Sequence, residues 1–148
     1  TYCRRVQSTL ELRRITMKIE AATYNGEAMK RVYENEKWTV GIKNWKPGSD
    51  VTMISNLERH NLTDELFILL AGECTLIFAN ETDAGMKFEG VKMEPFTLYN
   101  IPCTLWHNAI MSKDARIAVI EDVSTGIENS NFYELNPDEA AAVRSLVK

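Results

Sequence analysis

Long apolar runs, blocks of basic residues and paired cysteines are all missing from this sequence of 148 residues. No run approaches the roughly 20 apolar residues that a bilayer-spanning helix needs, which argues against a membrane protein. Lys and Arg never form a block longer than a pair, and the formal net charge is −4, which argues against nucleic acid as a partner. These absences predict an ordinary globular protein whose partner is a small molecule.

Cysteine is also scarce, and its pattern argues against a disulfide framework. Cys3, Cys74 and Cys103 are an odd number, and no two of them form a C-x-x-C pair. Reduced thiols fit this pattern better than bridges do, so we expect a cytoplasmic protein.

The length fits one domain with a single apolar core. Residues 1–16 contain two Arg pairs but lack the apolar region of a signal peptide. We interpret them as an N-terminal extension, non-native or poorly ordered, with no part in the function. Met17 is then the native start, and residues 17–148 form the single domain.

Short strands separated by turn residues dominate the chain from Lys37 onward. We expect hairpins around Gly72 and between residues 105–111 and 116–122. Asn136-Pro137 followed by two acids predicts the start of one C-terminal helix. The fold class is therefore all-β, a sandwich or barrel with a short helix. The expected strands cover residues 38–45, 51–57, 65–70, 74–78, 88–93, 96–101, 105–111 and 116–122.

Only two histidines occur, His60 and His107, and histidine is the commonest metal ligand in proteins. Glu65 opens the most apolar strand, where alternation places its side chain on the same face as Phe67 and Leu69. A carboxylate there needs a cation or hydrogen-bond donors to offset its desolvation.

The neighbours of the histidines extend this cluster. His107 shares a strand face with Leu105, Ala109 and Met111, and Glu58 shares one with His60. A mixed set of nitrogen and oxygen ligands suits Zn²⁺, Mn²⁺, Fe²⁺ or Ni²⁺. The structural alternatives are histidines satisfied in the core, a Glu65 paired with a Lys or Arg, and a Glu58 paired with a surface cation such as Arg59.

The spacing of these residues resembles the two cupin motifs. His60, Glu65 and Gly72 stand as H-x4-E-x6-G, similar to the second half of the first motif, and Pro102 and His107 stand as P-x4-H, similar to the second. The resemblance implies a double-stranded β-helix, or jelly roll, with ligands at its wider end. It places His60, Glu65 and His107 at three of the four metal-ligand positions of the family.

Several positions depart from the cupin pattern. Glu58 stands where the family has its first histidine, and Thr52 replaces the glycine that opens the first motif. In the second motif, Phe96 and Thr104 stand at the glycines and Met111 stands at the usual Asn.

Three functions follow from the resemblance. The first is a divalent-metal-dependent enzyme, an isomerase, lyase or similar, acting on a small oxygen-rich metabolite such as a sugar or hydroxy acid. His60, Glu65 and His107 would hold the metal, and Glu58 would be a fourth ligand or the general base. The second is a metal-free ligand-binding or sensor module, which the incomplete motifs favour. The third is structural oligomerisation, since the resemblance also implies a homodimer.

Overall fold

The computed structural model describes residues 17–148, so the interpretation of residues 1–16 lies outside the described residues. Within this range the chain forms ten strands and one α-helix, and none of its helices is long and apolar enough to cross a membrane. Short 3₁₀ turns lie at Pro47–Ser49 and Ile127–Asn129. The elements are β1 (Met29–Glu34), β2 (Trp38–Asn44), β3 (Asn56–His60), β4 (Glu65–Ala71), β5 (Cys74–Thr82), β6 (Gly85–Lys92), β7 (Leu98–Ile101), β8 (Trp106–Met111), β9 (Arg116–Asp122), β10 (Ser130–Glu134) and α1 (Pro137–Arg144).

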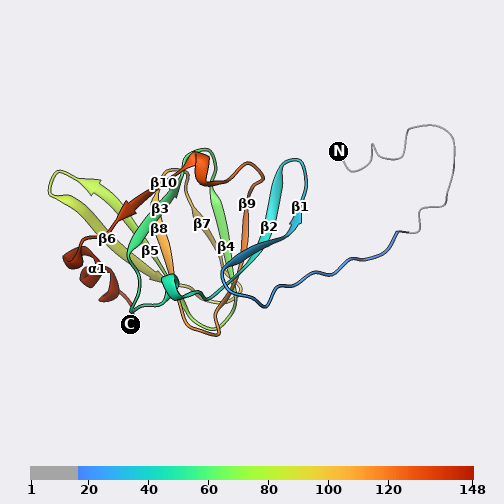
Figure 1. Cartoon of the computed structure of the whole chain (residues 1–148), viewed down its shortest axis with the longest axis horizontal. Coiled ribbons are helices and arrows are strands. Elements are labelled where there is room, and N and C mark those ends of the chain that lie inside the picture. The colour runs from blue at the N-terminus through green and yellow to red at the C-terminus, as the bar shows by residue number, and fades with distance from the viewer. Residues whose placement is uncertain (1–16) are drawn as a thin grey trace.

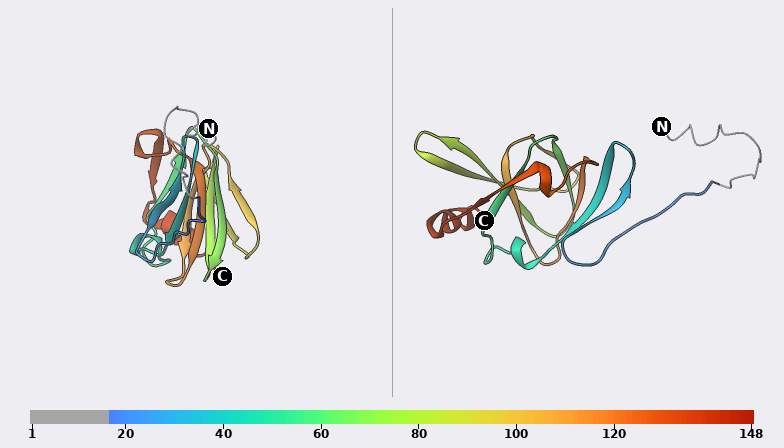
Figure 2. Two further views of the ribbon diagram at one scale, coloured as in Figure 1. Left: turned by 90° about the vertical axis from the view of Figure 1, so that its right-hand side faces the viewer. Right: turned by 45° about the horizontal axis from the view of Figure 1, so that its top comes forward.

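The strands form two five-stranded sheets that make the opposite walls of a barrel (Figure 1). One sheet has the order β1-β2-β9-β4-β7, and the other has the order β10-β3-β8-β5-β6. All pairings between these strands are antiparallel. The β1–β2 hairpin lies at one end of the molecule and α1 at the other (Figure 2). The predicted all-β jelly roll with one C-terminal helix is therefore confirmed.

Both hairpins expected from the sequence are wrong, because consecutive strands cross between the sheets. β4 pairs with β7 and β9, whereas β5 pairs with β6 and β8, so the turn at Gly72 passes the chain from one sheet to the other. The turn between β8 and β9 does the same. In both cases the two consecutive strands lie in opposite sheets. They face each other across the core and do not pair side by side as a hairpin.

Two strands also differ from the expected boundaries. The strand expected over residues 51–57 starts later, because the Asp50 carboxylate accepts hydrogen bonds from the backbone N–H and hydroxyl of Thr52 and holds a turn there. His60, expected just after a strand, is the last residue of β3. The strand expected over residues 96–101 starts at Leu98, because Phe96 has a φ of 62° that does not continue a strand.

The apolar core lies between the two sheets. β4 buries Phe67 and Leu69, which are 1% and 6% exposed, while Leu70 on the other face is 54% exposed. The prediction that Glu65, Phe67 and Leu69 share one face is confirmed, although the opposite face is less buried than expected. The other buried members of this core are Cys74, Leu76, Met93, Ile101, Ala109, Met111, Ala115, Ile117 and Val119.

A second apolar cluster covers the outer face of the β10-β3-β8-β5-β6 sheet. Val143 of α1 is fully buried against this sheet, together with Leu57, Ile77 and Ile110. A capping box between Asn136 and Glu139 begins the helix, as the sequence predicted. This sheet is therefore covered on both faces, which holds β3 and β8 in place beneath the polar end of the barrel.

Three positions of the cupin-like motifs share the backbone conformation that glycine favours. Gly72 has a φ of 69°, and a Cβ atom there would lie 2.5 Å from the Cα of Ala115. Phe96 and Thr104, which replace motif glycines, have φ values of 62° and 71°. The backbone thus keeps the left-handed turns at these two positions although neither residue is glycine.

Candidate metal centre

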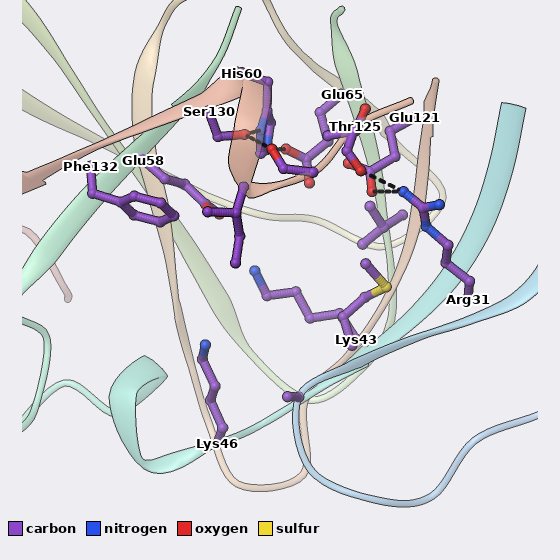
Figure 3. A pocket seen from close by; sticks show the side chains of 15 residues that line it. Arg31, Lys43, Lys46, Glu58, His60, Glu65, Glu121, Thr125, Ser130 and Phe132 are labelled. Carbon is purple, nitrogen blue, oxygen red and sulfur yellow. Dashed lines mark hydrogen bonds and ion pairs between the residues drawn. The ribbon is translucent and has the colours of Figure 1, made fainter. Parts of the chain in front are cut away.

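Strand register brings the predicted site residues together at one end of the barrel, where Glu58, His60 and Glu65 line a pocket (Figure 3). Glu58 of β3 lies opposite His107 of β8, and His60 lies two residues further along β3 on the same face. Glu65, the first residue of β4, lies opposite Glu121 of β9. The two sheets therefore contribute side chains to one cluster from opposite walls.

The two imidazoles converge on a single carboxylate oxygen. His60 Nε2 lies 2.8 Å from Glu65 Oε2, and His107 Nε2 lies 3.2 Å from the same atom. His60, Glu65 and His107 are 9%, 5% and 3% exposed. The three residues that the sequence singled out as metal ligands thus form one compact, buried group.

The outer nitrogens of both rings are held by hydrogen bonds that assign their protons. Ser130 donates its hydroxyl hydrogen to the Gly126 carbonyl, so its oxygen accepts the 2.8 Å hydrogen bond from His60 Nδ1. The Leu105 carbonyl can only accept, so His107 Nδ1 donates to it over 2.9 Å. In a neutral imidazole each Nε2 then carries a lone pair directed at Glu65. A cation between these atoms satisfies all three, and so does protonation of the rings, which turns each Nε2 into a donor to Glu65.

The pKa shifts of Glu65 and His60 indicate that the ionised Glu65 carboxylate is stabilised by positive charge beside it. Burial alone raises the pKa of Glu65, but hydrogen bonds from the protonated forms of His107 and His60 outweigh it and bring the pKa well below its usual value. The hydrogen bond to Glu65 raises the pKa of His60, against the opposing effect of burial. The ionised carboxylate is thus the preferred form of Glu65.

Two of the separations between the three ligand atoms fit an octahedral divalent ion. Two ligands at right angles about an ion, each about 2.1 Å from it, lie about 3.0 Å apart. The observed 2.8 Å and 3.2 Å separations bracket this value. Imidazole nitrogens with outer N–H groups already bonded to protein oxygens are also typical of metal ligands. The residues present therefore fit a metal.

Two further carboxylates lie within reach of the same centre. Glu58 forms one group with His60 and His107, and Glu121 forms another with His60 and Glu65; within each group the ligand atoms lie within 4.8 Å of one another. Each carboxylate is thus close enough to complete the ligand set or to serve as a base beside it.

Glu58 does not make the surface ion pair that was its structural alternative. Among the described residues no Lys or Arg lies within salt-bridge distance of its carboxylate. The neighbouring Arg59 points to the other face of β3, where its guanidinium lies 4.3 Å from the Trp106 ring centroid. Glu58 instead lines the pocket next to His60.

The sequence did not identify Glu121 or Arg31. Glu121 is 7% exposed, and burial and the nearby Glu65 charge raise its pKa to about 7. Arg31 lies 3.7 Å from Glu121 and donates to the carbonyls of Val123 and Thr125. The available signal was the alternation of β9, because Glu121 continues the face of two buried apolar residues. Arg31 left no such signal in the sequence.

A cavity of about 260 Å³ opens beside the cluster. It is at or below the lower end of the range for drug-sized ligands, so it fits a small metabolite. Carboxylates and His60 line one side, with Arg31 beside Glu121, and Lys43 and Lys46 line the other (Figure 3). Apolar side chains, among them Met29 and Phe132, complete the wall.

The overall structure is similar to known cupins, although no family model and no curated protein matches the sequence. A cupin-2 domain protein from Shewanella frigidimarina has a TM-score of 0.50 and 18% identity, over 67% of this chain and 84% of that one. BH2720 from Bacillus halodurans has a TM-score of 0.53 and 16% identity, over 69% and 74%. A variant of Streptomyces PAC13, described with uridine, has a TM-score of 0.55 and 9% identity, over 80% and 93%. These likenesses show that the chain has the cupin fold.

Proposed function

Because the chain has the cupin fold, we propose that it is a divalent-metal-dependent enzyme acting on a small oxygen-rich metabolite, as an isomerase, lyase or similar enzyme. His60, Glu65 and His107 hold the metal in this proposal. The observation that carries it is the convergence of two imidazole Nε2 atoms on one oxygen of Glu65. Zn²⁺, Mn²⁺, Fe²⁺ and Ni²⁺ all suit such a set of ligands.

The protein residues would divide the work as follows. A divalent ion, when bound, supplies Lewis-acid polarisation of a substrate oxygen. Glu58 lies beside His60 without a cationic partner among the described residues, so its carboxylate can accept a proton from the substrate and return it to a neighbouring atom. Arg31 anchors the β9 end of the site through Glu121.

One structural likeness is consistent with lyase chemistry. Pac13, described as a nucleoside dehydratase, has a TM-score of 0.52 and 9% identity, over 76% of this chain and 83% of that one. At this identity the likeness concerns the fold alone. It supports the view that a barrel of this kind can host such a reaction, and the substrate here must be argued from this chain's own residues.

Metal content of the purified protein tests the proposal. We expect near-stoichiometric Zn, Mn, Fe or Ni in the wild type by elemental analysis, and its loss in the His60→Ala, His107→Ala double variant. Glu89→Ala, which removes a carboxylate on β6 away from the site, should keep the metal and serves as the control. Wild-type protein that stays metal-free after incubation with all four ions would contradict the proposal.

The role of Glu58 has a separate test. We expect Glu58→Gln to keep the metal content of the wild type, because three ligands remain, and to abolish exchange of carbon-bound hydrogen in a hydroxy-acid panel in D₂O, followed by NMR. Loss of metal in this variant would assign Glu58 to the ligand set and not to proton transfer.

The alternative function is a metal-free ligand-binding or sensor module. Glu58 stands where the family pattern has a histidine, and protonated His60 and His107 would satisfy Glu65 without an ion. A metal-free protein that binds small ligands through its side chains would support this alternative.

Location and assembly remain proposals. Cys74 and Cys103 are both free, which supports the reducing conditions of the cytoplasm. A homodimer is the assembly we expect, and sedimentation of the purified protein would test it.

A further inference from the structure

We propose that the substrate of this site is a small carboxylate whose anionic group binds Lys43 and Lys46, across the pocket from Glu58 and His60 of β3. This inference rests on the proposed function, and it adds the chemical class of the substrate. Lys43 lies on β2 and Lys46 just after it, so both belong to the wall opposite β3. In Figure 3 both ammonium groups point into the open centre of the pocket.

Lys43 is the stronger of the two contacts. Lys43 is half-buried near the C-terminal end of β2, and its ammonium lies 5.5 Å from the ring centroid of Phe67, a core residue. No carboxylate of the described residues lies within salt-bridge distance of Lys43 or of Lys46. Lys43 interacts with Glu65 only at longer range, where its charge lowers the pKa of that carboxyl group. An ammonium in a pocket without a salt bridge is costly, and an anionic ligand would offset that cost.

The third cation of the pocket is already engaged and does not compete for the ligand. Arg31 donates to the Val123 and Thr125 carbonyls over 3.1 Å and 2.7 Å and lies 3.7 Å from Glu121. Its guanidinium therefore stabilises the polar end of β9. Lys43 and Lys46 are therefore the cations of this pocket that can bind an anionic group of the substrate.

The charge balance of the pocket favours an anion once the metal is present. Cationic side chains and carboxylates are equal in number in the lining, so a divalent ion leaves an excess of positive charge. A pocket with an excess of positive charge attracts an anionic ligand and raises its local concentration. The cations are Arg31, Lys43 and Lys46, and the carboxylates are Glu58, Glu65 and Glu121.

Size and polarity narrow the ligand further. The cavity of about 260 Å³ accommodates a short carbon chain, and Phe132, Met29 and Val119 offer apolar contact to it. Hydroxyl or carbonyl oxygens at one end of the chain would face the metal ligands, and a carboxylate at the other end would face the lysines. Short hydroxy or oxo acids have this arrangement.

Matched ligand pairs test the inference on metal-loaded protein. Glycerate and threonate carry a carboxylate, and glycerol and threitol are their neutral counterparts of the same chain length. By isothermal titration calorimetry we expect both acids to bind at least about tenfold more tightly than the alcohols, as hydrogen bonds to charged groups allow. Erythritol 4-phosphate, a phosphate ester of similar length, should bind more weakly than threonate.

Variants of the lysines assign the effect to the proposed groups. Lys43→Gln should weaken threonate about tenfold, and Lys46→Gln, whose side chain is more exposed, about threefold. Neither should change binding of threitol or the metal content. Lys87→Gln on β6 is the control and should change nothing, because Lys87 lies on the other sheet outside this pocket.

The failure of this inference differs from the failure of the proposed function. Metal content is measured first on the same samples, and a wild type without metal contradicts the proposed function. If metal-loaded protein does not prefer the acids, prefers the phosphate ester, or keeps its threonate affinity in both lysine variants, the carboxylate inference is wrong.

Discussion

At the scale of single residues, Phe96 and Thr104 adopt a backbone conformation that suits glycine better. Their φ values are 62° and 71°, Phe96 is fully exposed, and Thr104 is exposed as well. A non-glycine residue in the left-handed region costs about 1–2 kcal/mol of folding free energy. Substituting glycine removes this strain, but the greater freedom of glycine in the unfolded chain offsets part of the gain. The cupin motif indicates that glycines are usual at these two positions. The φ values show that the backbone keeps the left-handed turns without them.

Glycine at these two positions should therefore stabilise the protein. We expect Phe96→Gly and Thr104→Gly each to raise the free energy of unfolding by about 0.5–1 kcal/mol, measured by urea denaturation. Glu94→Gly, at an exposed position without positive φ, should lower it by about the same amount. A loss of stability in both motif variants would show that their side chains make contacts that outweigh the strain.

Cys74 offers a prediction of pH dependence away from the candidate site. Burial raises the pKa of its thiol to about 12, from about 9 in the unfolded chain. Between these values the unfolded state binds fewer protons, so the free energy of unfolding falls as pH rises. We expect the melting temperature to fall more steeply above pH 9 in the wild type than in Cys74→Ala. Equal slopes would show that the thiol ionises in the folded protein.

At the scale of elements, β10 positions His60 of β3, a proposed metal ligand. Ser130 lies opposite His60 in the strand register, and its hydroxyl accepts the hydrogen bond from Nδ1 while donating to the Gly126 carbonyl. This pair of bonds holds the ring with Nε2 toward Glu65. The sequence did not predict β10, because Ser130–Glu134 shows no alternation of apolar and polar residues.

Removing this hydroxyl should weaken the metal centre without removing a ligand. In the proposed function, Ser130→Ala lowers metal affinity by about 10–100-fold, the usual effect of losing a hydrogen bond to a ligand histidine. Ser130→Thr keeps the hydroxyl and should restore most of the affinity, measured by competition with a chelating dye. Unchanged affinity in Ser130→Ala would mean that β10 does not orient His60.

The strands differ in how far the sequence predicts them. β4 is a continuous apolar run and β8 is mostly apolar, so both could be identified as strands, and their period of two gives the residues that share a face with Glu65 and His107. β1 has no such run, because most of its residues are polar and exposed. Which strand lies beside which depends on contacts far apart in the chain, and the two expected hairpins were wrong for that reason.

At the scale of the whole molecule, the site depends on two sheets that close over one end of the barrel. The cluster of His60, Glu65 and His107 was predictable because each residue sits in a recognisable spacing. The position of Lys43 and Lys46 in the pocket was not predictable, because a lysine on a strand is expected to face solvent, and only the fold places Lys43 at the pocket. Glu121 likewise acquires its environment only in the fold, from β4 and β2 on either side of it and from Arg31.

In the proposed function, His60 Nε2 and His107 Nε2 bind one metal ion. Electron paramagnetic resonance of the protein loaded with Cu²⁺, an ion that such sites bind strongly, counts the imidazole nitrogens on the metal. We expect two imidazole nitrogen ligands in the wild type and one in each of His60→Ala and His107→Ala. A spectrum without imidazole nitrogen coupling, or one that both single variants leave unchanged, would contradict it.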